Sequence, residues 1–275
     1  MAAQTRFFHL KTRGERGMNL FLSMFSRKWI FTTLLVVLGS AVCVRLGIWQ
    51  LDRLEQRRAF NAHYLQMTSL PSLNLNTELP SDLTQMEYRS VTVTGMFDFE
   101  HQVALRNRYY NNEYGYHLLT PLLLPNGTAI LVERGWIPAE GNATPADWRK
   151  YDQPGRQTIQ GILRLGQTRP ELGGVPDPTL TPGQTRLEFW NIINLERIAL
   201  QVPYSLLPVF IQPAPDATRT TPPYPYQPEI EITEGPHFGY ALQWFTFASI
   251  LFFGYPFYLR RMESSDTTAY EKDNK

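Results

Sequence analysis

Two long apolar runs dominate the hydrophobic pattern of this chain. Residues 29–48 read WIFTTLLVVLGSAVCVRLGI, and residues 238–259 read FGYALQWFTFASILFFGYPFYL. A helix of about 20 residues crosses the hydrocarbon core of a bilayer, and it satisfies its own backbone hydrogen bonds in lipid. The apolar core of the first run is too long for a typical cleaved signal peptide. The pattern therefore predicts a membrane protein with two transmembrane helices.

Small side chains recur along the first run at every fourth residue, namely Gly39, Cys43 and Gly47. This spacing places them on one face of a helix, and such a stripe lets two membrane helices approach closely. The alternative is coincidence, because glycine is common in membrane helices. We expect this face to contact the second span.

Between the two runs the pattern changes to the alternation of half-buried strands. Residues 88–97, YRSVTVTGMF, place valines and threonines on opposite faces. The apolar runs 117–124 and 128–136 are joined by Pro125-Asn126-Gly127, and Asn-Gly signals a hairpin because both residues tolerate positive φ. Further strands are predicted at residues 101–107, 157–165, 187–193 and 206–212. We expect a mostly antiparallel sheet, open or closed as a small barrel.

Helical patterns outside the spans are few. Residues 51–67 predict a helix that continues the first span until Pro71, and residues 195–201 predict a short helix. The segments 171–186 and 213–228 are rich in glycine and proline and predict loops. The expected organisation is a basic arm 1–28, transmembrane helix 29–48, β-rich domain 49–237, transmembrane helix 238–259 and tail 260–275.

The distribution of charge predicts the orientation in the membrane. The arm 1–28 carries six Lys or Arg and one acidic residue, and two arginines follow the second span directly. Positive flanks stay in the cytoplasm, so both termini are expected there and the β-rich domain on the other side. Residues 50–236 carry fifteen basic and twenty acidic residues, and the whole chain has a formal charge of +1. This balance gives no sign of a nucleic-acid partner.

The sequence lacks the local motifs of common enzyme classes. It contains no Gly-x-Ser-x-Gly, no phosphate-binding loop and no dinucleotide-binding glycine motif. Cys43 is the only cysteine, and no two histidines have the spacing of a metal site. The sequence therefore predicts a protein that is not an enzyme.

One of the five histidines stands out. His237 follows Pro236, which suits the first turn of a helix, and it stands at the mouth of a segment without charges. Ionisable groups at such a depth are rare and usually functional. Two interpretations stay open: a polar anchor at the interface, or an imidazole ligand to haem, whose face would lie against Tyr240, Ala241 and Trp244. Structural or solvent-facing roles are expected for the other four, His9, His63, His101 and His117.

Four motifs occur in order along the chain. They are LGIWQLDR at residues 46–53, GYHLLTPL at 115–122, VERGWIP at 132–138 and HFGYALQWFTFA at 237–248. With these motifs and its two spans, the chain resembles the Surfeit-locus family of cytochrome c oxidase assembly factors. Residues 139–186 depart from the family pattern.

The resemblance implies a two-span anchor that holds an extracytoplasmic β domain, and a role in building the haem–copper oxidase of a respiratory chain. The implied cofactor is haem a, with His237 as its iron ligand and with Tyr240 and Trp244 beside it. Arg53 or Arg134 would meet the haem propionates, because a guanidinium matches a planar carboxylate. The plainer expectation is that these arginines pair with neighbouring acidic residues.

The partners implied by the resemblance are the catalytic subunit of the oxidase, haem a synthase and the membrane. The expected location is a bacterial plasma membrane, with the mitochondrial inner membrane as the alternative. A second function also stays open. The protein would then be a membrane-anchored scaffold that binds an oxidase subunit through its β domain and touches no haem.

Overall fold

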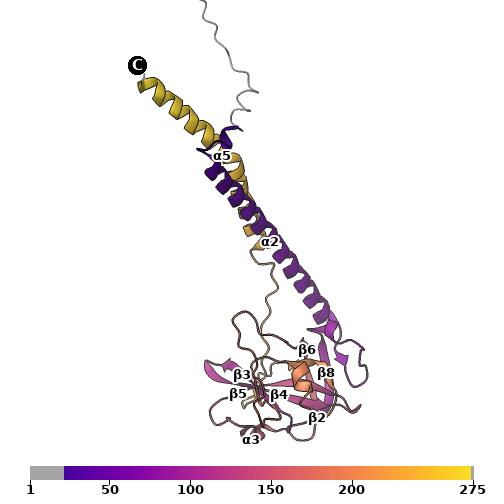
Figure 1. Ribbon diagram of the computed structural model, residues 1–275. Coiled ribbons are helices and arrows are strands. Elements are labelled where there is room, and N and C mark those ends of the chain that lie inside the picture. Colours follow the sequence, from indigo (N-terminus) through magenta and orange to yellow (C-terminus); the bar gives the residue numbers. More distant parts are fainter. Residues whose placement is uncertain (1–21, 274–275) are drawn as a thin grey trace, which may run out of the picture. The chain divides into compact units, whose positions relative to one another are not determined.

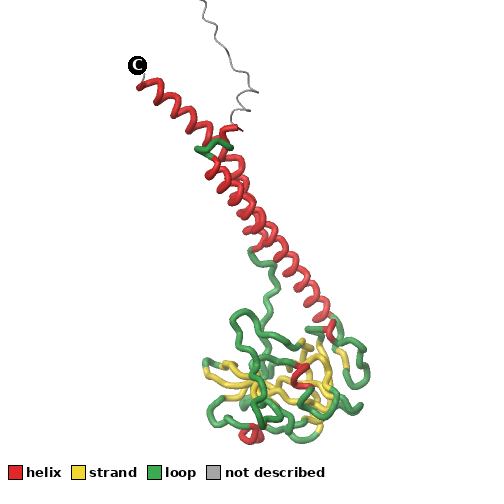
Figure 2. The backbone as a smooth tube through the Cα atoms, viewed as in Figure 1, coloured by secondary structure: helices red, strands yellow, loops and turns green. Residues whose placement is uncertain are grey.

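The computed structural model describes residues 22–273 and divides into two compact units (Figures 1 and 2). The helical unit contains the described residues up to Asn61 and those from Ile232 onward, and the β unit is Ala62–Glu231. Most of the predicted basic arm lies outside the described residues.

Two long helices dominate the helical unit. They are α2 (Ile30–Ser69, 40 residues) and α5 (His237–Asp273, 37 residues). The predicted helical continuation of the first span is confirmed, because α2 is unbroken up to Ser69, two residues before Pro71. α5 begins directly after Pro236, as the sequence predicts.

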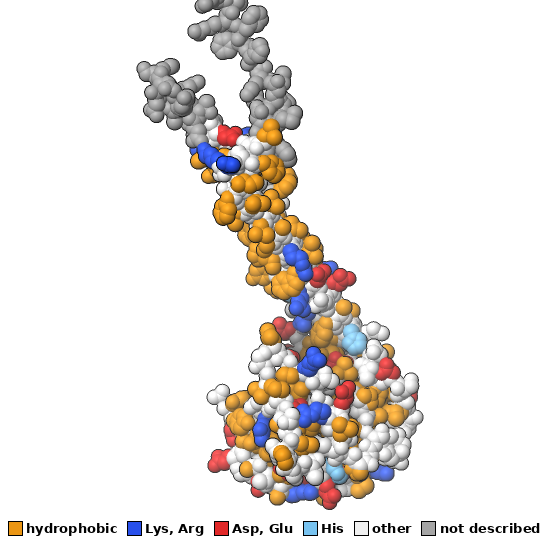
Figure 3. Space-filling view, in the orientation of Figure 1, with side chains coloured by type: hydrophobic (Ala, Val, Ile, Leu, Met, Phe, Trp, Pro, Cys, Tyr) orange, Lys and Arg blue, Asp and Glu red, His pale blue; other side chains and the backbone are white. Residues whose placement is uncertain are grey.

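α2 has the length and the apolar composition of a membrane-crossing helix, and among the described residues it is the one helix that passes this test. This is consistent with a membrane-anchored protein. The predicted second span, residues 238–259, lies entirely within α5. Both helices leave large apolar side chains exposed, as Figure 3 shows; examples are Phe31, Leu35, Leu38, Leu242, Ile250 and Phe253.

α2 and α5 contact each other along the small-residue stripe. A Cβ atom added at Gly47 would lie 2.7 Å from the ring of Phe245, whereas one added at Gly39 would lie 3.5 Å from Leu251. Near the other end of the pair, Thr33 Oγ1 and the Tyr255 hydroxyl are 2.6 Å apart and both buried. Gly47 is therefore the point of closest approach among these positions.

The β unit is built on one sheet that closes on itself. Its strands are β1 (Leu73–Asn74), β2 (Ser90–Phe97), β3 (Val103–Tyr110), β4 (Glu113–Leu123), β5 (Ala129–Pro138), β6 (Arg156–Leu165), β7 (Phe189–Trp190) and β8 (Leu206–Pro213). They follow the order β1-β2-β6-β8-β5-β4-β3-β7, and an additional pairing of β2 with β4 closes a barrel of β2, β6, β8, β5 and β4. The expected sheet is thus a closed five-stranded barrel.

Most strand pairs are antiparallel, as predicted, with β5–β8 the main exception. β5 and β8 are parallel because β6 and α4 (Leu195–Ala199), together with long loops, stand between them in the chain. The remaining short helices are η1 (Thr84–Met86), α3 (Pro145–Trp148) and η2 (Arg149–Tyr151).

Two apolar clusters lie on opposite faces of the barrel wall. The inner cluster draws on all five barrel strands and includes Ile130 and Val132, while the outer cluster includes Leu131 together with side chains of β3, β7 and α4. Successive residues of a strand point to opposite faces. β5 is therefore buried on both sides, which explains its unbroken apolar run.

One sequence prediction needs correction, and two further details were not predicted. Residues 187–193 form a strand only at Phe189–Trp190. In the β4–β5 turn only Gly127 has a positive φ, of 84°, because the side chain of Asn126 instead accepts a hydrogen bond from the Thr128 amide. α3 was not predicted, although Thr144 and Asp147 form a capping box at its start.

Candidate functional site

His237 occupies the first position of α5, where it contacts α2. Its Nδ1 lies 2.9 Å from Oε1 of Gln50, and the imidazole is half-buried. A carbonyl oxygen only accepts, so Nδ1 carries the hydrogen and donates it to Gln50. In the neutral imidazole this leaves the lone pair on Nε2, the nitrogen that a metal ion would use. Gln50 belongs to the LGIWQLDR motif, so the structure joins the first and last family motifs.

The chain leading into α5 is tied to α2 by polar contacts. Arg58 makes a bidentate ion pair with Glu234, in which Nε and Nη2 lie 2.7 and 2.9 Å from the two carboxylate oxygens. The carbonyl of Thr233 accepts hydrogen bonds from Arg57 and Asn61. These contacts fix the entry to the helix three to four residues before His237.

The other predicted haem-contacting residues of the helical unit lie close in sequence to this point. Tyr240 is 48% exposed and Trp244, four residues on, is half-buried, so the two share a helix face. Ala241, which was predicted to lie beside them, is only 1% exposed. Arg53 is exposed; it bonds Gln56 and lies over the ring of Trp49.

Arg134 belongs to the β unit. It is 4% exposed, it donates to the side chain of Gln102 and to the carbonyl of Tyr151, and its guanidinium lies over the rings of Phe97 and Phe99. Burial lowers its pKa to about 10. A propionate would reach this guanidinium only by displacing existing contacts.

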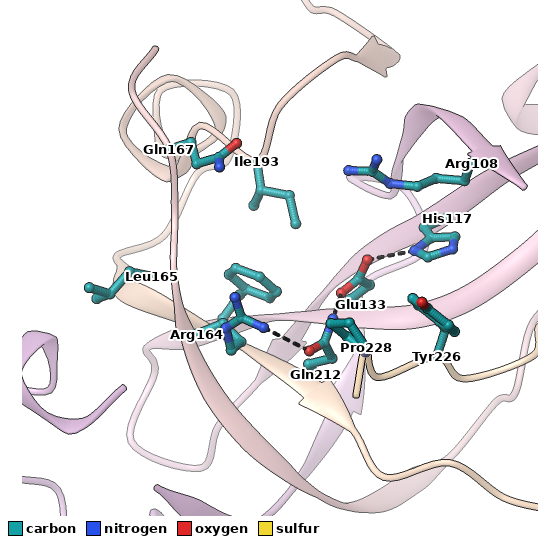
Figure 4. A pocket seen from close by; sticks show the side chains of 11 residues that line it. Arg108, His117, Glu133, Arg164, Leu165, Gln167, Ile193, Gln212, Tyr226 and Pro228 are labelled. Atoms are coloured by element: carbon teal, nitrogen blue, oxygen red, sulfur yellow. Dashed lines mark hydrogen bonds and ion pairs between the residues drawn. The ribbon is translucent and has the colours of Figure 1, made fainter. Parts of the chain in front are cut away.

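A polar pocket of about 280 Å³ opens on the outer side of the β unit (Figure 4). At its centre Nδ1 of His117 and Oε1 of Glu133 are 2.6 Å apart, and both residues are no more than 5% exposed. Gln212 donates to the second Glu133 oxygen at 2.8 Å and accepts from Arg164 at 3.1 Å. The chain of contacts ends at Glu87, which pairs with Arg164. The network runs across the four neighbouring strands β4, β5, β8 and β6, and its members His117, Glu133 and Gln212 are buried.

Burial opposes ionisation of the Glu133 carboxyl group. The hydrogen bond and charge of His117, the amide of Gln212 and the positive charge of Arg108 favour the carboxylate, and together they outweigh burial. The pKa of Glu133 therefore lies below its ordinary value.

Two β-bulges lie in the strands around the pocket, and the first of them brings Arg108 to its lining. On β3, Leu105 pairs with His117 and Arg108 pairs with Gly115, so three steps on β3 match two steps on β4. The extra residue lies within the pair Arg106-Asn107, and Asn107 adopts the left-handed region with φ of 59°. Arg108 consequently shares the face of His117, and Figure 4 shows both directed toward the cavity.

The second bulge lies in the VERGWIP motif. Gly135 has φ of 127°, and a Cβ atom there would lie 2.4 Å from the backbone of Tyr224, so glycine is required. Arg134 points to the face of β5 opposite to Glu133 by ordinary alternation, and the bulge returns Trp136 to the face of Glu133. This separates two neighbouring motif residues into two different polar networks.

The pocket was not predicted from the sequence: His117 was expected to have a structural role, and Arg134 to pair with a neighbouring acidic residue such as Glu133. Glu133 pairs with His117 instead. The pairing of His117 with Glu133 could have been found from the hairpin that joins the motifs GYHLLTPL and VERGWIP. Counting back from the turn at Pro125–Gly127 places Leu119 opposite Glu133, and His117 is two residues further along the same face.

The comparisons with known proteins agree with the motifs. The model of the SURF1 family matches residues 37–249. A SURF1-like protein of Caenorhabditis elegans is 28% identical over 80% of this chain and 72% of its own length. One of Monosiga brevicollis is 30% identical over 74% and 78%, and an uncharacterised SURF1-like protein of Mycobacterium tuberculosis is 26% identical over 80% and 79%. The matched region begins within the apolar part of α2 and ends within α5, and the chain therefore belongs to the SURF1 family of oxidase assembly factors.

Proposed function

We propose that this protein binds haem a at the mouth of the helical unit and assists its delivery to the catalytic subunit of a haem–copper oxidase, without catalysis of its own. The observation that carries the proposal is the hydrogen bond from His237 to Gln50. A metal-binding histidine commonly donates its second ring hydrogen to an oxygen atom, which fixes the ring and its tautomer. Gln50 supplies such an oxygen.

The side chains around the start of α5 fit haem a. Haem a supplies, when bound, an iron that accepts an imidazole nitrogen and an apolar ring system with carboxylate arms. His237 would hold the iron through Nε2, and Tyr240 and Trp244 offer aromatic surface on an adjoining face of the same helix. Arg53 is exposed and can turn its guanidinium to a carboxylate, whereas Arg134 is committed to other contacts.

The membrane arrangement is part of the proposal. Residues 238–259 of α5 form the second span, because their exposed apolar side chains suit lipid and they contact α2 through Gly47 and Tyr255. Both termini then lie in the cytoplasm, and the β unit lies outside it, where it docks on the catalytic subunit and can meet haem a synthase. Basic residues precede the N-terminal end of the first span and follow the C-terminal end of the second span, which supports this orientation in a bacterial plasma membrane.

The test is the absorption spectrum of full-length protein purified from cells that make haem a. The unaltered protein should carry haem a, and His237→Ala should lose the bands of the ligated iron. His63→Ala is the matched control, because His63 is also half-buried and lies on α2. It should leave the spectrum unchanged.

Two results would reject haem binding at this site. One is an unchanged spectrum in His237→Ala. The other is an unaltered protein without haem that still copurifies with the catalytic subunit, which would support the scaffold function instead.

A further inference from the structure

The pocket of the β unit contains a cationic side chain that the surrounding network leaves available. Glu133 is engaged by His117 and Gln212, and Arg164 is engaged by Glu87 and Gln212. Arg108 also lines the pocket, and no side chain among residues 22–263 makes a hydrogen bond or ion pair with its guanidinium. A guanidinium offers five N–H donors in a planar fork. Arg108 therefore presents a complete set of donors to the cavity.

The local backbone is arranged to bring Arg108 to this place. Without the bulge, the alternation along β3 would direct Asn107, not Arg108, to the side of His117. The bulge requires Asn107 to adopt φ of 59°, an uncommon conformation for a residue other than glycine. Bulges often redirect a side chain next to a functional site.

The remaining walls define the ligand further. One side is polar and consists of the His117–Glu133 pair, Gln167, Gln212 and the half-exposed Tyr226. The other side is apolar and consists of Leu165, Ile193, Phe210 and Pro228. A cavity of about 280 Å³ holds a small molecule and is below the usual volume for drug-sized ligands.

From these features we propose that the pocket binds a small organic monocarboxylate, with the carboxylate on Arg108 and a short hydrocarbon body against Phe210 and Ile193. A single available guanidinium matches one carboxylate bidentately. The other charges of the pocket have partners, so a second negative charge on the ligand would meet no free cation there. The site is separate from His237, which belongs to the helical unit.

The experiment measures binding of butanoate and benzoate to the full-length protein in detergent by saturation-transfer NMR. Butanamide and benzamide are the neutral controls, because they keep the shape and lose the charge. We expect saturable binding of both acids and much weaker binding of the amides. Arg108→Gln should weaken acid binding on the order of tenfold to hundredfold, the range for loss of a charged hydrogen-bonding partner.

Arg156→Gln is the matched control, because Arg156 is an exposed arginine at the start of β6 and lies outside the pocket. It should bind both acids like the unaltered protein, and so should His237→Ala. Arg108→Lys should bind with intermediate strength, since it keeps the charge and loses the fork. The circular dichroism of each variant should match the parent, because the side chain of Arg108 contributes no hydrogen bond to the fold.

Three outcomes would overturn the proposal: no saturable binding of either acid, equal binding of acids and amides, or a folded Arg108→Gln protein that binds the acids like its parent. None of these results bears on haem at His237. Failure of this inference is therefore distinguishable from failure of the proposed function.

Discussion

Replacing Glu133 with Ala should destabilise the β unit more than almost any other single removal of a carboxylate. Glu133 accepts hydrogen bonds from His117 at 2.6 Å and from Gln212 at 2.8 Å. Those two partners are 4% and 6% exposed, so water does not readily replace the lost oxygen atoms. Leaving these two buried donors without their charged acceptor costs on the order of 3–5 kcal/mol in total.

This magnitude is large against the whole stability of a domain, about 5–15 kcal/mol. For a unit of this size 1 kcal/mol moves the unfolding temperature by about 2–4 °C, so a fall between about 6 and 20 °C is expected. Glu133→Gln should fall less. Its amide can still accept from His117, but its NH₂ group would face the NH₂ group of Gln212 unless that side chain turns over and releases Arg164.

The assay is thermal unfolding of the full-length protein in detergent, followed by near-ultraviolet circular dichroism. Glu113→Gln is the matched control, because Glu113 is an exposed glutamate at the start of β4, and it should change the unfolding temperature by less than about 2 °C. If Glu133→Ala unfolds within 2 °C of the control, the network contributes little stability and the reasoning is wrong.

Three more expectations follow from the same structure. Because the folded pKa of Glu133 lies below its ordinary value of 4.5, the stability that it contributes is present above pH 4.5 and is lost as the pH falls through the folded pKa; acid unfolding of Glu133→Gln should show a smaller pH dependence than that of the parent. Gly47→Val should disturb the pairing of α2 and α5, because its Cβ would lie 2.7 Å from the Phe245 ring, whereas Gly39→Ala should not; disulfide trapping between cysteines placed at positions 33 and 255 in a Cys43→Ser background measures the difference, and equal trapping would contradict it. A reporter active only outside the cytoplasm should give signal when fused at residue 150 and none when fused after residue 275, and the reverse pattern would reject the proposed topology.

Local patterns along the chain were sufficient for most elements of the fold. The alternation in residues 88–97 predicts β2, the Asn126-Gly127 pair predicts the β4–β5 hairpin, and the apolar runs predict the two long helices. Each of these depends on neighbours in the sequence, so a single chain is enough to reveal it.

Closure of the barrel was not predictable in this way. Met96 and Phe97 of β2 pair with Leu123 and Leu122 of β4, a contact that joins the ends of two strands and leaves no periodic signal. The site residues show the same limit. His117 and Glu133 are 16 positions apart, and they meet only through the pairing register of β4 with β5, which the alternation within either strand does not reveal.

The bulge on β3 also affects how related chains can be aligned. Between Leu105 and Arg108 this strand contains one residue more than a regular strand needs to bring both side chains to the same face. A related chain that lacks one residue there would keep its arginine toward the pocket without any bulge. A one-residue deletion at Arg106-Asn107 is therefore neutral for the face on which Arg108 lies. An alignment forced through this point without a gap would pair Arg108 with the wrong residue and conceal a shared arginine.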